Sequence, residues 1–159
     1  MRRLQSWGRR EAIRDTSKGM GGFLVAVDFS ERSAAAVSLA VELAVGRDVF
    51  VDLLHVVGVG SGLGLGQPEA QDALSRAAMQ ETRRTDRELE SLLATIPRPH
   101  RGEAIIRAGV PADVICQESA SYSLVIVATA GRTGLQAVLI GSVAEEVVRN
   151  APVPVLVVR

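Results

Sequence analysis

Residues 124–134, LVIVATAGRTG, and residues 141–146, GSVAEE, decide the fold of this chain. The first segment begins with an apolar run rich in β-branched side chains, which predicts a buried strand. Glycines follow the run, and Ser142 with Glu145 three residues later is typical of a helix that the serine caps. A strand, a loop of small residues and a helix start bring backbone amides and a helix dipole together, and both attract an anion. The stretch therefore predicts a phosphate site.

The rest of the chain repeats the alternation of apolar strands and helices. Further strands are predicted over residues 23–28, 49–57, 103–107 and 152–158, and further helices start after Ser30, at Pro68 and at Pro111. This βαβαβαβαβ pattern predicts an α/β fold, a single doubly wound open parallel sheet of five strands with helices on both faces. Polar residues in the third strand and prolines in the fifth indicate that these two strands lie at the edges. Ligands of such sheets bind beyond the carboxyl ends of the strands, where the strand order reverses.

Composition indicates one folded domain preceded by a basic tail. The chain has 159 residues, of which 47% are hydrophobic, so it is long enough for one sizeable core. Residues 1–20 lack periodicity, and residues 1–19 hold six basic against two acidic side chains. We expect residues 1–20 to form a disordered basic tail, with contact to an anionic partner as the alternative, and residues 21–159 to form the domain. The domain holds twelve basic and sixteen acidic residues, which argues against a nucleic-acid partner.

Membrane segments and redox sites are not expected. No apolar run reaches the roughly 18 residues that span a bilayer, and the first residues lack the apolar core of a signal peptide. We therefore expect a cytoplasmic protein without a membrane partner. The single cysteine, Cys116, cannot form an internal disulfide, and its apolar neighbours predict a small buried hydrophobe.

A few polar residues at strand ends are candidates for chemistry. Asp28 ends the first strand beside Ser30, so it is either a helix-start residue or a ligand contact. His55 ends the second strand, and a hydrogen-bonded structural histidine is favoured over a general base because no relay partner stands at a suitable spacing. His100 lies among arginines and prolines and is predicted to be exposed. The two separated histidines and one cysteine form no transition-metal ligand set.

Four segments together resemble the universal stress protein (UspA-like) family. They are VAVDFS at residues 25–30, LLHV at 53–56, GSVAEEVVR at 141–149 and PVPVLVV at 152–158. The resemblance extends over nearly all of the chain beyond the tail. It implies an adenine nucleotide alpha hydrolase-like fold with strand order 3-2-1-4-5 and a role in the stress response.

The nucleotide-binding branch of this family has a loop of the form Gly-x-x-Gly, nine residues, then Gly-Ser or Gly-Thr. In this sequence the second glycine is Gly131 and the final pair is Gly141-Ser142. The first glycine is replaced by Ala128, and a histidine often found before the second glycine is replaced by Ala130. An added methyl group is tolerated where the backbone has ordinary β dihedrals, and a lost polar contact costs about 1 kcal/mol. Both changes are therefore expected to preserve the site.

The resemblance implies the residues that surround the nucleotide. Asp28 and the backbone of Ala26 and Val27 are expected to face the ribose and adenine, the Val56 backbone the base, and the loop and helix start the phosphates. Arg132 is either a phosphate contact or a solvent-facing arginine. ATP, ADP or AMP is the expected ligand, with or without Mg²⁺. The implied nucleotide-binding set is Ala26, Val27, Asp28, Val56, Val127, Ala128, Gly131, Gly141, Ser142 and Val143.

The loop predicts binding without fast catalysis. A Walker A loop has a lysine directly before its final Ser or Thr, whereas this chain has Ile140 and Gly141 before Ser142. We expect a regulatory or stress-response module that is at most a weak ATPase. The alternatives are a dimeric scaffold that binds no nucleotide and a slow ATPase of the same fold. A homodimer through the strand from Val153 to Val158 is expected from its apolar, edge-forming sequence and from the resemblance.

Overall fold

The structure, a computed structural model, describes residues 21–58, 68–129 and 140–159, and for residues 68–79 it describes only the backbone. Strands and helices alternate along the described chain. In chain order the elements are β1 (Phe23–Ala26), α1 (Glu31–Ala44), β2 (Val51–Val57), α2 (Pro68–Ala94), the 3₁₀ turn η1 (Arg98–His100), β3 (Arg101–Ala108), α3 (Pro111–Ser119), β4 (Leu124–Ala128), α4 (Ser142–Asn150) and β5 (Val155–Val158).

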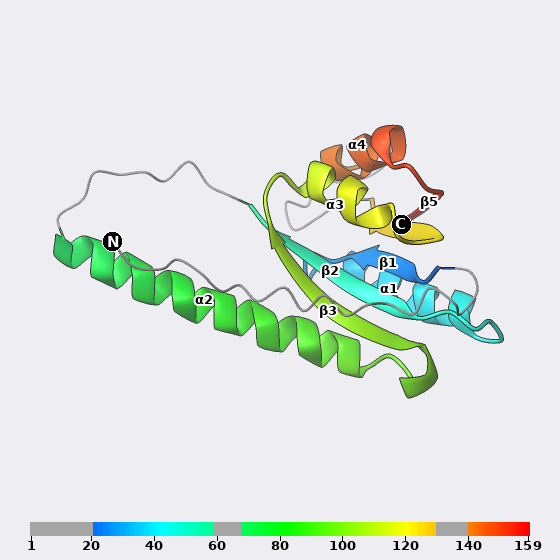
Figure 1. The fold of residues 1–159 in the computed structure, drawn as a ribbon, viewed down its shortest axis with the longest axis horizontal. Helices are drawn as coiled ribbons and strands as arrows, with labels where there is room; N and C mark the ends of the chain where they lie inside the picture. Colours follow the sequence, from blue (N-terminus) through cyan, green and yellow to red (C-terminus); the bar gives the residue numbers. More distant parts are fainter. Residues whose placement is uncertain (1–20, 59–67, 130–139) are drawn as a thin grey trace.

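The strands form one five-stranded sheet with the order β3-β2-β1-β4-β5. Every neighbouring pair is parallel. Helices α1 and α2 lie against one face, and α3 and α4 lie against the other (Figure 1). This arrangement confirms the predicted doubly wound α/β fold and the strand order 3-2-1-4-5. The edge positions predicted for the third and fifth strands are also correct.

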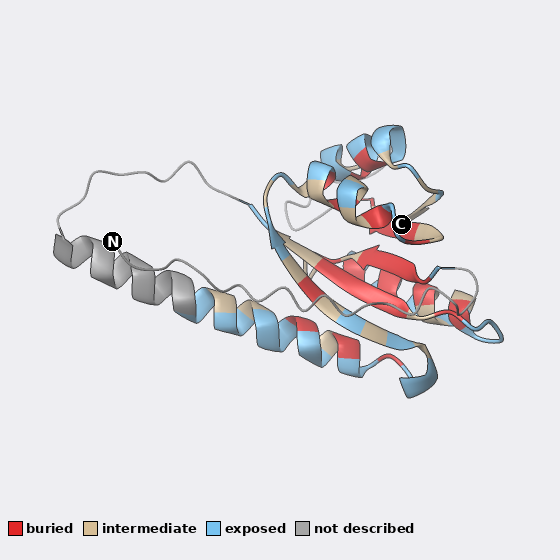
Figure 2. Ribbon diagram, viewed as in Figure 1, coloured by how far each residue is buried: buried red, intermediate tan, exposed pale blue. Residues whose placement is uncertain are grey.

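The sheet separates two hydrophobic cores. Val25 and Leu53 face α1 and α2, and their neighbours Leu24 and Leu54 face α3 and α4. All four side chains have no exposed surface, and the central strands in Figure 2 are accordingly the most buried part of the sheet. Strands that are covered on both faces need continuous apolar runs, which explains why β1 and β4 were visible in the sequence.

Helix α1 begins and ends at residues with matching local chemistry. The Ser30 side chain accepts a hydrogen bond from the Ser33 amide, as an N-cap residue does. After the helix, Gly46 has φ +77°, a conformation that glycine adopts without steric cost. The structure therefore confirms Ser30 as the start signal and Gly46 as the stop signal.

Strand β3 is longer than residues 103–107, the range predicted from its sequence. It starts at Arg101 because the buried Asp52 of β2 substitutes for part of the backbone ladder. The pairing shifts register between Val51 and Leu53, and the Asp52 Oδ1 atom accepts a hydrogen bond from the Glu103 amide at 2.8 Å. A side-chain carboxylate that fills a bulge in this way is a long-range feature, so the local sequence does not predict the extension.

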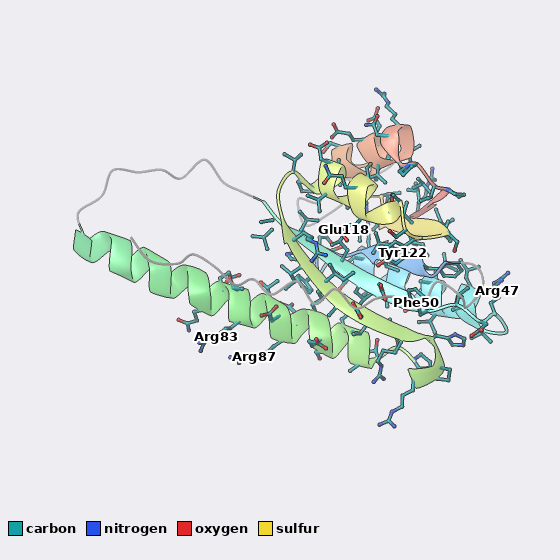
Figure 3. The ribbon with its side chains drawn as sticks, in the orientation of Figure 1. Arg47, Phe50, Arg83, Arg87, Glu118 and Tyr122 are labelled. Atoms are coloured by element: carbon teal, nitrogen blue, oxygen red, sulfur yellow. The ribbon has the colours of Figure 1, made fainter. Side chains whose placement is uncertain are left out.

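The same carboxylate joins the sheet to the connection before β4. Tyr122 donates its hydroxyl to Asp52 Oδ2 at 2.6 Å, and its ring lies edge-on to Phe50 with 6.4 Å between the ring centroids (Figure 3). Gly102 leaves room for the carboxylate, since a Cβ atom at that position would lie 1.8 Å from Asp52 Oδ1. We call this group the Asp52 cluster; it consists of Asp52, Gly102, Glu103 and Tyr122. Its contacts join the amino ends of the strands.

The turn between α2 and β3 is held by side-chain contacts to carbonyl groups. Arg101 donates from Nε and Nη2 to the Ile96 carbonyl at 2.9 and 2.7 Å, and from Nη2 to the Ala94 carbonyl at 2.6 Å. His100 Nδ1 lies 3.0 Å from the Val49 carbonyl, and the side chain is half-buried. The prediction that His100 is exposed was therefore wrong, because the imidazole joins the turn to the segment before β2.

Candidate functional site

The strand order reverses between β1 and β4, which lie side by side in the sheet. From β1 the chain enters α1 on one face, whereas α4 packs on the opposite face (Figure 1). Ligands of open α/β sheets bind at the carboxyl ends of the strands at such a switch point. Most of the predicted site residues that the structure describes lie at this edge. They are Ala26, Val27 and Asp28 after or at the end of β1, Val56 near the end of β2, and Val127 and Ala128 at the end of β4.

Asp28 is part of the turn that starts α1. Its Oδ1 atom accepts hydrogen bonds from the Ser30 hydroxyl at 2.6 Å and from the Ser30 amide at 3.0 Å. Burial by itself would raise the pKa of the Asp28 carboxyl, but hydrogen bonds from Ser30 and Ser33 outweigh it, and the pKa lies below its usual value of 3.8. The side chain is thus an anionic helix-start residue, and Ser30 engages only one of its two oxygens.

Phe29 and His55 hold the end of β1 in an unusual conformation. Phe29 has φ 63° and is the only non-glycine residue with a positive φ in the described part of the chain, a conformation that costs an L-residue about 1–2 kcal/mol. Its ring lies 4.6 Å from the His55 ring, centroid to centroid, and packs on the core under α1. His55 Nδ1 lies 2.8 Å from the Val27 carbonyl oxygen. The hydrogen bond predicted for His55 is confirmed.

The backbone ladder between β1 and β2 stops just before Val56. Its last hydrogen bond runs from the Val27 amide to the Leu54 carbonyl at 2.8 Å. In a parallel pair, residues two apart direct their N–H and C=O groups to the same neighbour, so Val56 directs both groups toward the side where β1 has ended. Within the described ranges, no hydrogen bond joins the Val56 amide to the Val27 carbonyl. The Val56 amide and carbonyl therefore have no backbone partner on this side among the described residues.

Thr129 brings the start of α4 to the end of β4. Its amide donates to the Val158 carbonyl at 2.8 Å, and its carbonyl accepts a hydrogen bond from the Gly141 amide. The side chain is 7% exposed. Thr129 was not predicted to belong to the site. Its β-branched side chain, directly after the predicted strand, was a signal that the strand pairing continues. Thr129 and Gly141, on either side of the segment that is not described, are thus joined to each other.

Helix α4 starts differently from the prediction. Gly141, not Ser142, is the N-cap, and no side chain caps the helix. Glu145 does not reach back to the helix start but pairs with Arg149 at 2.6 Å. Because the helix does not use the Ser142 hydroxyl as a cap, and because Ser142 and Val143 are both exposed, a ligand at the helix start can meet the hydroxyl and the first amides.

The remaining predicted site residues divide into two groups. The Val27 and Val127 side chains are buried at 5% and 3% exposure, so only their backbone atoms can contact a ligand. Gly131, Arg132 and Ala130 lie outside the described residues. The structure thus assembles nine of the ten implied residues at the carboxyl edge of the sheet, on or near its strands and at the start of α4.

Other candidate groups lie away from this edge or form no cluster. Cys116 is half-buried and packs against the core under α3 and α4, and burial, together with Asp113 and Glu146, raises the pKa of its thiol. In residues 21–58, 68–129 and 140–159, no group of three or more His, Cys, Asp and Glu side chains is arranged to hold a metal ion. No helix in these ranges combines the length and the apolarity needed to cross a bilayer.

Comparison with known proteins identifies the family. The family model described as Universal stress protein family matches residues 21–159. The chain belongs to the universal stress protein family. Universal stress protein MJ0531 of Methanocaldococcus jannaschii is 30% identical over 138 residues, which is 86% of this chain and 80% of that protein.

Two solved structures show the same fold. The structure of hypothetical protein MJ0577, also from Methanocaldococcus jannaschii, has a TM-score of 0.73 at 23% identity and covers 87% of this chain and 94% of that one. The universal stress protein from Archaeoglobus fulgidus in complex with dAMP has a TM-score of 0.57 at 23% identity and covers 89% of this chain and 99% of that one.

Proposed function

We propose that this universal stress protein binds an adenine nucleotide, namely ATP, and acts as a regulatory module in the stress response. The observation that carries the proposal is that the backbone donor and acceptor of Val56, at the carboxyl edge of the sheet beside β1, have no partner among the described residues. The relative from Archaeoglobus fulgidus that was solved with dAMP supports the same class of ligand.

The chemistry of Val56 favours adenine over guanine. On its Watson–Crick edge adenine presents a ring acceptor, N1, next to an amino donor, N6. An N–H and a C=O group of one strand residue complement this pair. Guanine presents a donor and an acceptor in the opposite order, so each of its groups would meet a like group of Val56. A buried polar group without a partner costs about 1–3 kcal/mol, which is enough to discriminate between the bases.

The other described residues suit a ribose and a phosphate chain. Asp28 is anionic, and both hydrogen bonds from Ser30 go to its Oδ1 atom. Its Oδ2 atom can therefore accept a hydrogen bond from a ribose hydroxyl. The Ser142 hydroxyl and the first amides of α4 lie across the switch point, tied to β4 by the Gly141 to Thr129 bond. Backbone amides at a helix start attract phosphate, and Mg²⁺ would neutralise part of its charge.

The same residues favour binding over turnover. Fast phosphoryl transfer needs positive charge directed at the leaving oxygens. At the start of α4 this chain has Ile140 and Gly141 where a Walker A loop has its lysine and the residue before it. We therefore propose a nucleotide-dependent regulator, with at most slow ATP hydrolysis.

Calorimetric titration tests the proposal. Purified protein is titrated with ATP, ATP and Mg²⁺, AMP and GTP, and its co-purifying nucleotides are identified by mass spectrometry. Adenine nucleotides should bind and GTP should not, and Ser142→Ala should weaken ATP binding about fivefold, as expected for one hydrogen bond. If no adenine nucleotide co-purifies and the protein does not bind ATP at millimolar concentration, the dimeric scaffold remains as the function.

Ala128→Gly measures the effect of the altered loop. If the alanine has ordinary β dihedrals, as the end of β4 requires, its methyl group is tolerated. ATP affinity should then change less than about threefold on restoring the glycine. A much larger gain would identify a degraded nucleotide site.

We further propose that the protein forms a homodimer through the segment from Val153 to Val158. Strand β5 lies at the sheet edge, and each of its residues is half-exposed. The Pro154 and Val158 carbonyls bond inward to β4, so by alternation Val155 and Val157 direct their backbone groups outward. Light scattering should give a dimer for the wild type and a monomer for Val157→Pro, which removes an outward donor. A monomeric wild type would refute this interface.

A further inference from the structure

The unpaired state of Val56 needs a physical cause, because parallel strands normally continue to pair for as long as both are extended. The next bond of the ladder would run from the Val56 amide to the Val27 carbonyl. In the structure that carbonyl is 2.8 Å from His55 Nδ1 instead. An imidazole side chain therefore binds the carbonyl to which the Val56 amide would otherwise donate, and the described residues show no bond from that amide to it.

The acceptor determines which tautomer His55 adopts. A carbonyl oxygen only accepts hydrogen bonds, so Nδ1 must carry the proton, and in the neutral ring Nε2 is then the unprotonated nitrogen. The Phe29 ring packs against the imidazole in a tilted arrangement, with 4.6 Å between the ring centroids. Phe29 also turns the chain away from the sheet through its φ of 63°. His55 thus binds the Val27 carbonyl, and the positive φ of Phe29 ends the extended conformation two residues later.

We propose that His55 is a positioning residue of the nucleotide site. By binding the Val27 carbonyl it stops the β1–β2 ladder one bond early and leaves the Val56 N–H and C=O groups unpaired for the base of the nucleotide. This inference rests on the proposed function for the identity of the ligand, but the effect of His55 on Val56 is a property of the unliganded protein.

The central test compares variants at His55 with a matched histidine. His55→Leu removes the donor, and His55→Asn restores an N–H donor near the position of Nδ1. His100→Leu is the control, because His100 also contacts a backbone carbonyl through Nδ1, that of Val49 at 3.0 Å, at the opposite edge of the sheet. A merely structural histidine should lower stability in the same way at either position.

Amide hydrogen exchange of unliganded protein, measured by NMR, gives the first readout. In the wild type the Val56 amide should exchange quickly for a strand residue, and ATP should slow it. In His55→Leu the amide should pair with the Val27 carbonyl and exchange about tenfold more slowly without ligand, as expected for one new backbone hydrogen bond. His55→Asn and His100→Leu should resemble the wild type.

Ligand affinity gives the second readout and separates the base from the phosphates. His55→Leu should weaken ATP binding about tenfold, the effect of losing one base hydrogen bond, and should leave tripolyphosphate binding unchanged. His55→Asn should restore ATP affinity. An equal loss for both ligands, or no loss for ATP, would overturn the positioning role.

The proposal remains testable if His55→Leu does not fold. The wild-type His55 side chain should then show the Nδ1–H tautomer in its ¹⁵N spectrum, and an Nε2–H tautomer would overturn the proposal. If the wild type binds no adenine nucleotide, the proposed function fails, whereas the exchange rate of the Val56 amide still decides whether His55 controls the ladder.

Discussion

At the amino edge of the sheet the buried Asp52 carboxylate has both oxygens engaged, by the Glu103 amide and the Tyr122 hydroxyl. At the carboxyl edge the Val56 backbone groups have no partner among the described residues, and Phe29 holds a strained conformation. The first edge satisfies its polar groups internally, as a folding element must. The second leaves polar groups unsatisfied and stores strain, which is typical of a binding site. Mutations at the two edges should therefore affect different properties.

The largest effect is expected from Asp52→Ala at the amino edge. The variant leaves the Glu103 amide and the Tyr122 hydroxyl without this acceptor in a buried environment. The free energy of unfolding, measured with urea, should fall by about 3 kcal/mol. The ATP affinity of the folded fraction should not change, and a change would contradict the separation of the two edges.

Gly102→Ala should have the next largest effect. Its Cβ atom would lie 1.8 Å from Asp52 Oδ1 and 2.8 Å from the Val51 carbonyl oxygen, so the carboxylate or the bulge must move. Overpacking of this kind costs about 2 kcal/mol. Gly58→Ala is the matched control, because a Cβ atom there meets nothing within 4 Å. Equal unfolding midpoints for the two variants would show that the Asp52 cluster tolerates displacement.

At the carboxyl edge, Phe29→Gly and Phe29→Ala sharpen the comparison. Both variants lose the ring that packs on His55, but only glycine adopts φ 63° without steric cost. The glycine variant should therefore be more stable than the alanine variant by about 1 kcal/mol. Thermal or urea unfolding of the two proteins measures the difference, and a more stable alanine variant would show that the turn is not strained.

The smallest effect is expected from Asp28→Asn and concerns pH. The pKa of Asp28 is lower in the folded protein than its usual value of 3.8. The carboxylate thus stabilises the fold above that value, and this contribution is lost as the pH falls through the folded pKa. Stability measured below about pH 4 should accordingly depend less on pH in Asp28→Asn than in the wild type. Ser30→Ala should reduce the dependence in part, because it removes one of the hydrogen bonds.

Most of the fold was predictable because its signals are local. Apolar runs indicated the buried strands β1 and β4. Helix α2 runs from Pro68 to Ala94 and helix α4 from Ser142 to Asn150, as predicted. The errors concern interactions between segments distant in sequence. The length of β3 depends on Asp52, which is 51 residues from Glu103. The burial of His100 depends on the Val49 carbonyl, which no local pattern indicates.

The location of the candidate site was predictable, but its working parts were not. In a parallel sheet the carboxyl ends of the strands meet at one edge, so Asp28, Val56 and Ala128 had to lie near one another. Which backbone groups stay unpaired there depends on one side chain, His55, and on one dihedral angle, that of Phe29. The capping role assigned to Ser142 also failed, because the hydroxyl makes no bond to the helix backbone.

The bond between the Gly141 amide and the Thr129 carbonyl has a consequence for evolution. It joins the two ends of the segment that carries Ala130, one of the two altered positions of the family loop, and Thr129 is in turn bonded to β5 through Val158. The cost of closing this loop is set by its anchors and its length, not by the residues between them. Substitutions such as alanine at position 130 can therefore accumulate with little loss of folding stability. The bond therefore lets the sequence of this segment change while the fold is kept.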